Sequence, residues 1–206
     1  IFLSMSANDQ VTGVLGVFIK LIVVIFVMTV VLLVVQFGLA GVVAGKNPFR
    51  MLRQMMTAYF TALGTQSSAA TIPVTLQQTI NNGVDPAIAR FVVPLCATIH
   101  LSGSTMKIVA CSLAIMLTTG MEVHPSVMVG FIFMLGITMV AAPGVPGGAI
   151  MAAVGILQSI LGFDETAVAL MIALYIAMDS FGTATNVTGD GAIAVIVDRI
   201  KTVRRD

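Results

Sequence analysis

Residues 21–44 form an apolar run of 24 residues that contains no charged side chain and a single amide, Gln36. A helix needs about 20 predominantly apolar residues to cross a lipid bilayer. Lys20 precedes the run and Lys46 follows it, and basic residues at the ends are typical of membrane-spanning helices. The run therefore predicts a transmembrane helix.

The rest of the chain also has the composition of a protein surrounded by lipid. Only 9% of its 206 residues are charged, whereas a soluble domain carries about 25% charged residues. Disordered chains need more charge, and nucleic-acid binders need a basic excess that a net charge of +1 does not supply. Cys96 and Cys111 lie in apolar stretches, so we interpret them as buried side chains without a disulfide. Residues 1–20 look like the end of a preceding helix and a loop, and we expect a piece of a longer protein.

Two apolar segments are interrupted before they reach a spanning length. Residues 49–80 are broken by the small polar run 66–73, and residues 127–162 are broken by 143–148, which holds two prolines and three glycines. Two half-helices that meet at a non-helical tip form a re-entrant hairpin, which a membrane tolerates only where the tip faces protein or a wet cavity. A single crossing with a proline kink is the alternative for the first segment.

Each interrupted segment is followed by a longer one whose centre is polar. Paired interrupted segments in corresponding positions of two halves indicate the midplane site of a transporter. The predicted fold class is an all-α membrane protein with transmembrane helices and two re-entrant helical hairpins. The expected transport domain covers 21–206, with a helix at 21–45, a re-entrant hairpin at 47–82, a broken helix at 91–120, a second re-entrant hairpin at 127–162 and a broken helix at 166–198.

The basic residues indicate the orientation. If the first hairpin enters and leaves the membrane on the side where residues 21–44 end, one face holds Lys46, Arg50, Arg53, Arg90, Arg199, Lys201, Arg204 and Arg205. The opposite loops hold Glu122, His124, Asp164 and Glu165 and no Lys or Arg. The positive-inside rule then makes the C-terminus cytoplasmic in a multi-pass protein of the plasma (inner) membrane. A full crossing by the first segment would place Arg90 on the wrong side, which favours the hairpin.

Ionisable residues deep in apolar segments are costly and indicate function, and this chain has His100, Lys107, Asp179 and Asp190. Asp179 and Asp190 are eleven residues apart, about three helical turns. They therefore share a helix face with Thr183 and Asn186, which lie between them. This stripe of oxygen-bearing side chains suits a cationic group, and sodium prefers hard oxygen ligands.

Two other interpretations use the same residues. A helix–helix clamp, for example between Asp190 and Lys107, would need no transported solute. His100 near Ser102 and Ser104, or Ser104 with Lys107, has the residue types of a hydrolase. Nothing in the sequence marks an oxyanion hole, so we do not expect an enzyme.

Three motifs make the chain resemble the dicarboxylate/amino acid:cation symporters, the glutamate transporter family. Residues 66–73 (QSSAATIP) look like the family's first hairpin tip, residues 144–149 (GVPGGA) look like its second, and residues 186–190 (NVTGD) match its last-helix motif. The resemblance implies an inverted-repeat arrangement and the C-terminal half of an elevator-type symporter with hairpin gates. It also implies a homotrimer, formed through scaffold helices upstream of this chain, that carries an amino acid-like substrate with sodium.

By position, the resemblance implies substrate-binding roles for Gln66, Ser67, Ser68, Ser104, Gly144, Val145, Asp179, Gly182, Thr183 and Asn186. Asp179 would meet the amino group of the substrate, and Asn186 would meet its main carboxylate. Sodium would be held by Asp190 and Asn186, by His100 in place of an amide ligand, and by backbone carbonyls near Cys96, near Thr98 and at 139–142.

One departure from the family pattern changes the expected substrate. The acidic-substrate members carry an arginine at the position of Gln66 or of Gly182, which pairs the side-chain carboxylate of the substrate. Because a buried carboxylate without its cation is strongly disfavoured, we expect a neutral amino acid. A proton-coupled transporter of dicarboxylates or acidic amino acids is the alternative. A channel-like anion conductor and a non-transporting partner subunit also stay open.

A second departure concerns the coupled ions. The family's Asn-Met-Asp-Gly-Thr centre is replaced here by residues 100–104 (HLSGS). The change removes one carboxylate, and Lys107 adds a cation nearby. We expect fewer coupled sodium ions, with a proton carried by His100, since a histidine titrates near neutral pH. Ser102 and Lys107 are further candidates for coupling.

Overall fold

The structure is a computed structural model that describes residues 11–203. All regular elements in that range are helices: α2 (Val11–Ala44), α3 (Pro48–Thr65), α4 (Ser68–Asn81), α5 (Pro86–Ile99), α6 (Ser102–Thr119), α7 (Pro125–Met139), α8 (Gly148–Leu161), α9 (Glu165–Ala177) and α10 (Asp179–Val203). The predicted all-α fold class is confirmed. Residues 1–10 of the expected leading segment lie outside the described residues. α2 begins at Val11 and not near 21, because residues 11–20 continue the apolar pattern without a proline.

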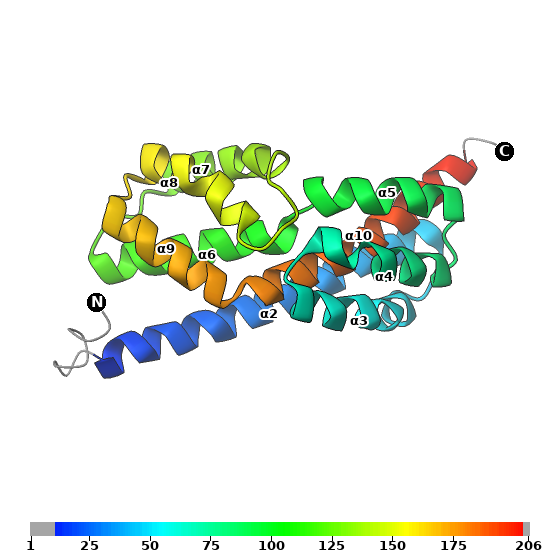
Figure 1. The fold of residues 1–206 in the computed structure, drawn as a ribbon, viewed down its shortest axis with the longest axis horizontal. Coiled ribbons are helices and arrows are strands. Elements are labelled where there is room, and N and C mark those ends of the chain that lie inside the picture. The colour runs from blue at the N-terminus through cyan, green and yellow to red at the C-terminus, as the bar shows by residue number, and fades with distance from the viewer. Residues whose placement is uncertain (1–10, 204–206) are drawn as a thin grey trace.

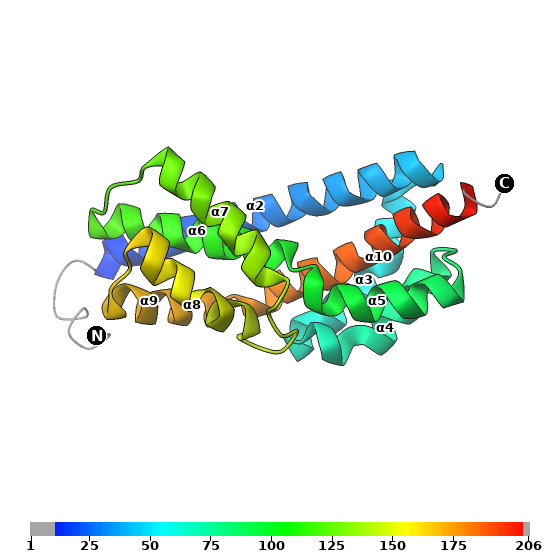
Figure 2. The same cartoon turned by 90° about the horizontal axis from the view of Figure 1, so that it is seen from above.

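The helices form an elongated bundle of two packed groups (Figures 1 and 2). α6, α7, α8 and α9 surround one cluster of buried apolar side chains, which includes Phe131 and Leu157. α3, α5 and α10 pack with the second half of α2 around another cluster, which includes Phe37 and Met55. α2 contributes to both clusters, and the buried polar side chains described below lie where the two groups meet.

The first hairpin consists of α3 and α4, and its tip is shorter than the predicted break at 66–73. Gln66 has a φ of 52°, in the left-handed region, and its N–H donates to the carbonyl of Ala62. Ser67 then caps α4, because its Oγ accepts a hydrogen bond from the N–H of Ala70 at 3.2 Å. These two residues reverse the chain, so Pro73 lies inside α4 and not in the break.

The second hairpin consists of α7 and α8, with a longer tip at 140–147. Pro143 and Pro146 have no backbone N–H and cannot continue a helix. Gly147 has a φ of 71° immediately before α8 begins. The two hairpin tips point toward each other from opposite ends of the bundle (Figure 1). Each hairpin is followed by a broken helix, which gives the inverted-repeat arrangement.

Both broken helices are interrupted near the middle of the bundle. α5 ends at Ile99 and α6 begins at Ser102, while α9 and α10 meet at an angle of 61°. Phe18–Ala44 and Pro86–Thr119 are long and apolar enough to cross a membrane, and the bent pair α9–α10 is a third candidate span. The helices of the second hairpin are shorter apolar segments.

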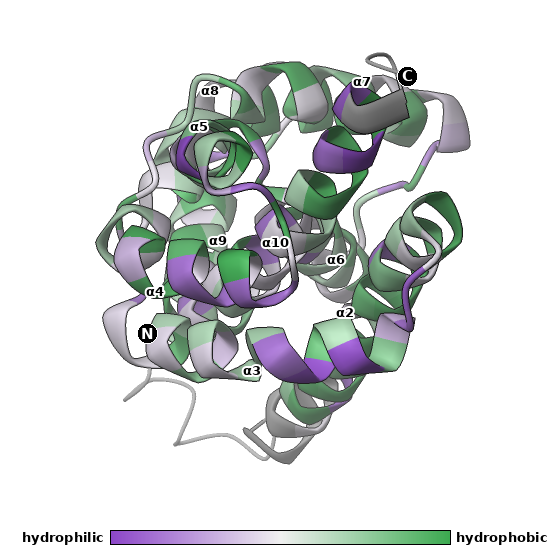
Figure 3. Cartoon of the chain, turned by 90° about the vertical axis from the view of Figure 1, so that its right-hand side faces the viewer, coloured by the Kyte–Doolittle hydropathy of each residue, from purple (hydrophilic) through white to green (hydrophobic). Residues whose placement is uncertain are grey.

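One end of the bundle joins the start of α3, the α4–α5 turn and the end of α10. Lys46 Nζ donates to the carbonyls of Asn82 and Gly83 at 2.9 and 3.1 Å, and the N–H of Asp85 donates to Asp198 at 3.3 Å. Figure 3 shows hydrophilic turns of α3 and α4 at this end. The fold therefore groups these basic segments together, and the side of the membrane that they face stays a prediction.

Candidate functional site

A polar cavity lies where the two hairpin tips meet the breaks in the two long helices. Its lining consists of Gln66, Ser68, Leu101, Ser104, Pro143, Gly144, Val145, Ala149, Tyr175, Asp179, Thr183 and Asn186. The cavity measures about 10 Å³, which is room for about one water molecule. A larger solute can therefore enter only if one of the lining segments moves.

The second hairpin tip is seated directly on the first. The carbonyl of Gly144 accepts hydrogen bonds from the N–H of Ala69 at 3.1 Å and from Ser67 Oγ at 2.9 Å. A Cβ atom at Gly144 would lie 2.5 Å from the carbonyl oxygen of Ala97, so a glycine is required for this approach. These contacts close the cavity on the side of the second tip.

Four helices begin at the cavity: α4 at Ser68, α6 at Ser102, α8 at Gly148 and α10 at Asp179. A helix N-terminus carries a partial positive charge of about half an elementary charge. The first backbone N–H groups of a helix have no acceptor within the helix, and they point along its axis beyond the N-terminus, where they can bind an anion. At two of these starts the first N–H groups already donate within the protein: that of Ala69 to Gly144, and those of Gly103 and Ser104 to Asn186. The four converging helix dipoles still favour a solute with a negatively charged group.

Asp179 is held at the cavity by two contacts within the protein. Its Oδ1 accepts from Lys107 Nζ at 3.0 Å, and its Oδ2 accepts from the N–H of Gly147 at 2.8 Å. Lys107 is fully buried. Lys107 thus contacts Asp179 and not Asp190, the example given above for a helix–helix clamp, because α6 packs against the break before α10 and Asp190 lies about three turns further along that helix.

Asn186 connects α10 to the start of α6. Its Oδ1 accepts from the N–H groups of Gly103 and Ser104 at 2.8 and 3.3 Å, and its Nδ2 donates to Ser104 Oγ at 2.9 Å. The residue at the N-cap position of α6, Leu101, provides no side-chain hydrogen bond. The Asn186 amide therefore caps α6 from a neighbouring helix.

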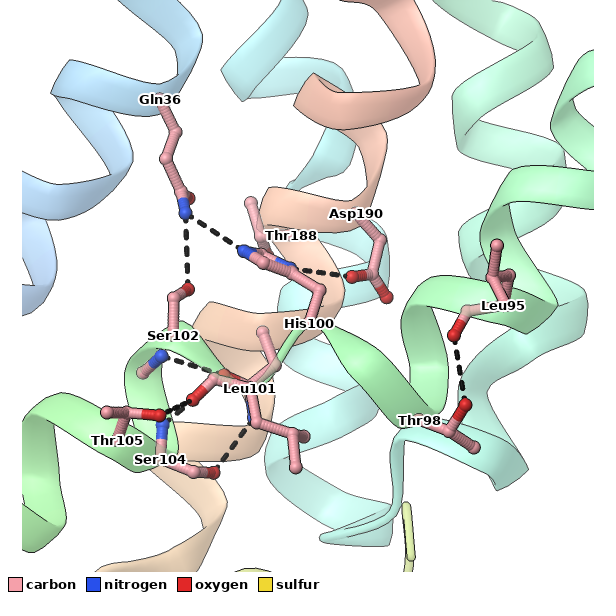
Figure 4. Close-up of polar contacts among 12 residues, drawn as sticks. Gln36, Leu95, Thr98, His100, Leu101, Ser102, Ser104, Thr105, Thr188 and Asp190 are labelled. Atoms are coloured by element: carbon pink, nitrogen blue, oxygen red, sulfur yellow. Dashed lines mark hydrogen bonds and ion pairs between the residues drawn. The ribbon is translucent and has the colours of Figure 1, made fainter. Parts of the chain in front are cut away.

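His100 and Asp190 form a second polar centre, shown in Figure 4. His100 Nδ1 lies 2.9 Å from Asp190 Oδ1. The Gln36 amide nitrogen lies 3.1 Å from His100 Nε2 and donates to Ser102 Oγ, also at 3.1 Å. His100 Nε2 therefore faces the Gln36 amide and Nδ1 faces the Asp190 carboxylate. A neutral His100 that accepts at Nε2 donates from Nδ1 to Asp190.

The structure brings most of the predicted substrate residues together at the cavity. Ser67 lies just behind the lining, where it bonds to the second tip. Gly182 also lies outside the lining, next to Lys107. Thr98 Oγ1 donates to the carbonyl of Leu95 at 3.0 Å on an exposed face of α5.

The predicted coupling and sodium residues Cys96, Thr98, His100, Ser102, Lys107 and Asp190 are not part of the cavity lining. Gln36 and Tyr175 also belong to these polar centres, and neither was predicted from the sequence to have a role. The sequence did contain a signal for Gln36, because a single amide in an apolar run of 24 residues indicates a polar contact. It contained no such signal for Tyr175, which lies in an ordinary apolar segment.

Comparison with known proteins identifies relatives of this chain. The family model described as "Sodium:dicarboxylate symporter family" matches residues 1–200. Excitatory amino acid transporter 1 from Homo sapiens is 34% identical over 163 residues, which cover 77% of this chain and 29% of that protein. Excitatory amino acid transporter 3 from Mus musculus is 35% identical over 164 residues, which cover 77% of this chain and 30% of that protein.

Excitatory amino acid transporter 5 from Homo sapiens is 34% identical over 160 residues, which cover 75% of this chain and 28% of that protein. The chain thus spans less than a third of the length of the curated relatives that it matches. The family match extends over almost the whole chain and includes both hairpins, the cavity and most of α10. This chain therefore belongs to the sodium:dicarboxylate symporter family and is a multi-pass integral membrane protein.

Proposed function

We propose that the full-length protein is a sodium-coupled secondary symporter for a small solute that carries a carboxylate. The observation that carries this proposal is the polar cavity between the two tips, at which four helices begin. Family membership supports the sodium coupling. In this proposal the chain forms the transport domain, and the scaffold helices and the homotrimer belong to other parts of the protein.

The second hairpin would act as the outer gate. The cavity is too small for an amino acid or a dicarboxylate, so access requires that a lining segment moves away. The second tip is the best candidate, because its contacts with the first tip are few and Val145 in it is half exposed. The hydrogen bond from Gly147 to Asp179 would hold the gate closed.

The sodium ions would bind as transported ions beside this cavity. Asp190, Asn186 and the backbone carbonyls near Cys96, near Thr98 and at 139–142 remain the proposed ligands. The contact between His100 and Asp190 supports the proposal that a histidine carries a proton in the place of one sodium ion. The number of coupled ions would then be smaller than in relatives with a carboxylate in this segment.

The identity of the solute is a finer proposal. Positions 66 and 182 hold glutamine and glycine and not arginine, which favours a neutral amino acid. The contact between Lys107 and Asp179 favours the alternative, a dicarboxylate, because it occupies the carboxylate that would receive a substrate amino group. Both expectations place a carboxylate of the solute at the helix starts.

A thermal-shift experiment on the purified full-length protein tests the proposed function. Small carboxylic acids and amino acids are each added with sodium and again with choline in its place. We expect sodium-dependent stabilisation by at least one carboxylate. If none of these compounds stabilised the protein, the result would instead support a non-transporting partner subunit. A steady current through liposomes without any added solute would support an anion conductor.

A further inference from the structure

The break between α9 and α10 forms a complete ammonium site, which the protein fills with its own lysine. Lys107 Nζ has three N–H donors, and three oxygen acceptors surround it: Asp179 Oδ1 at 3.0 Å, Met178 O at 3.2 Å and Tyr175 O at 3.4 Å. The centroid of the Tyr175 ring lies 3.5 Å from Nζ, where an aromatic face attracts a desolvated cation. Every donor of the buried ammonium is therefore satisfied.

The lysine occupies the only acidic side chain that the cavity offers to a solute. Of the residues that line the cavity, Asp179 alone is acidic, and both of its oxygens are engaged, by Lys107 and by Gly147. An ammonium group on a solute would thus enter a buried site without a free counter-charge, which is costly. A carboxylate instead experiences the positive ends of four helix dipoles, although the first N–H groups of α4 and α6 already donate within the protein.

We propose that Lys107 is an internal ammonium that takes the place of a substrate amino group, so that the cavity selects carboxylates without an amino group over α-amino acids. This inference rests on the proposed function, since it names the substrate class of the same cavity. Gly182 contributes to the arrangement. A Cβ atom there would lie 3.1 Å from Nζ and 3.3 Å from Cε of Lys107, so the glycine leaves the space in which the lysine lies.

The proposal is tested with ligands that differ only in an amino group. Succinate is compared with aspartate, and propionate with alanine, by calorimetric titration of the full-length protein in sodium. We expect the wild-type protein to bind succinate more tightly than aspartate, and propionate more tightly than alanine, by a factor of about 10 or more in each pair. The amino acids bind more weakly because their ammonium group would be buried without a counter-charge. Tighter binding of the amino acid in both pairs overturns the proposal.

The variant Lys107→Met leaves the Asp179 carboxylate free to accept the amino group of a ligand. The ratio of the two dissociation constants in each pair should shift toward the amino acid by a factor of about 30 or more, the effect of a buried charge partner. The double variant Lys107→Met, Asp179→Asn removes both charges, and its ratio should return toward that of the wild type. An unchanged ratio in the single variant contradicts the proposal, and if that variant does not fold, the wild type and the double variant decide.

Lys46→Met is the matched control. Lys46 also donates to two backbone carbonyls, those of Asn82 and Gly83, but it lies at the end of the bundle where α3 begins and contacts no residue of the cavity lining. Its loss should leave the ligand ratio unchanged. If Lys46→Met shifted the ratio of dissociation constants as much as Lys107→Met does, the effect would not be specific to the ammonium at the α9–α10 break. That result would overturn the proposed role of Lys107.

Chemical rescue tests the ammonium site without any carboxylate ligand. In Lys107→Ala, propylammonium has the atoms that the substitution removes. It should raise the melting temperature of the variant and leave that of the wild type unchanged, whereas propanol and tetramethylammonium should have no effect. Equal stabilisation by propanol, or none by propylammonium, overturns the ammonium site. A working rescue in a protein that binds none of the four carboxylates would instead contradict the proposed function alone.

Discussion

The two acidic side chains of α10 at the centre of the bundle each contact a basic residue from the region of the α5–α6 break. Asp179 bonds to Lys107 at 3.0 Å, and Asp190 bonds to His100 at 2.9 Å. Asp179 and Asp190 are both buried, and removing one partner of a buried pair leaves an uncompensated charge that is strongly destabilising. The four side chains therefore couple the position of α10 to the position of α6.

Replacing Asn186 by alanine should destabilise the protein by about 1–3 kcal/mol, because it leaves two buried backbone N–H groups of α6 without their acceptor. Thermal unfolding in detergent measures the effect. Asn82→Ala is the matched control, since Asn82 is another asparagine whose amide bonds to the backbone: its Nδ2 donates to the carbonyl of Met51 at the end of the bundle. Both variants should lose stability, and only Asn186→Ala should also lose ligand binding. Full binding in Asn186→Ala would show that the start of α6 is not part of the site.

Replacing His100 by asparagine should make transport independent of a proton gradient. An asparagine cannot carry a proton at neutral pH but offers an amide oxygen to a cation, so sodium should become the only driving ion. Uptake into proteoliposomes under separate sodium and proton gradients measures this. A wild-type protein that already ignores the proton gradient would contradict the proposed role of His100.

At the scale of the helices, the sequence could predict where the helices are interrupted. It could not predict which side chains from other helices contact these interruptions. Pro143, Pro146 and the serine-rich run at 66–73 are local signals, because they act on the backbone of their own segment. The partner of Lys107 depends on the 61° bend between α9 and α10, which no periodicity reports. Gln36 reaches His100 from a helix 64 residues away, so its role also required the three-dimensional structure.

Replacing Gly144 by alanine should weaken closure of the second hairpin. The new Cβ atom would lie 2.5 Å from the carbonyl oxygen of Ala97, and overpacking of this kind costs about 1–3 kcal/mol. Ligand affinity, measured by calorimetry, should fall while the fold is retained. Gly155→Ala in the same hairpin is the control, since a Cβ atom there meets nothing within 4 Å. Equal effects of the two substitutions would argue against closure at Gly144.

At the scale of the whole molecule, the two apolar clusters and the polar layer between them divide the bundle along its length. One cluster contains the second hairpin and the other contains residues of the first. The contacts that join the two groups at the cavity are mainly polar, such as those of Asp179 and Asn186. Polar contacts of this kind can be exchanged for contacts with a solute or an ion, whereas the apolar clusters keep each group intact.

The membrane orientation can be tested with three single cysteines at exposed positions, Phe49→Cys, Ala87→Cys and Ser126→Cys. Phe49 and Ala87 lie near the basic end of the bundle, and Ser126 lies in the first turn of α7 at the other end. A membrane-impermeant thiol reagent applied to intact cells should modify Ser126→Cys and reach the other two only after permeabilisation. Cys96 and Cys111 are buried, so they should add little background.

Each alternative topology gives its own labelling pattern. If α3 and α4 together crossed the membrane, Phe49→Cys and Ala87→Cys would be labelled from opposite sides, because a complete crossing would separate them. If the chain were inserted the other way round, they would be labelled together from outside, and Ser126→Cys only after permeabilisation. The pair thus tests the hairpin, while the side from which it is labelled tests the positive-inside assignment. Only a re-entrant first hairpin brings the start of α4 and the second tip to the same depth from opposite sides, which the cavity between them requires.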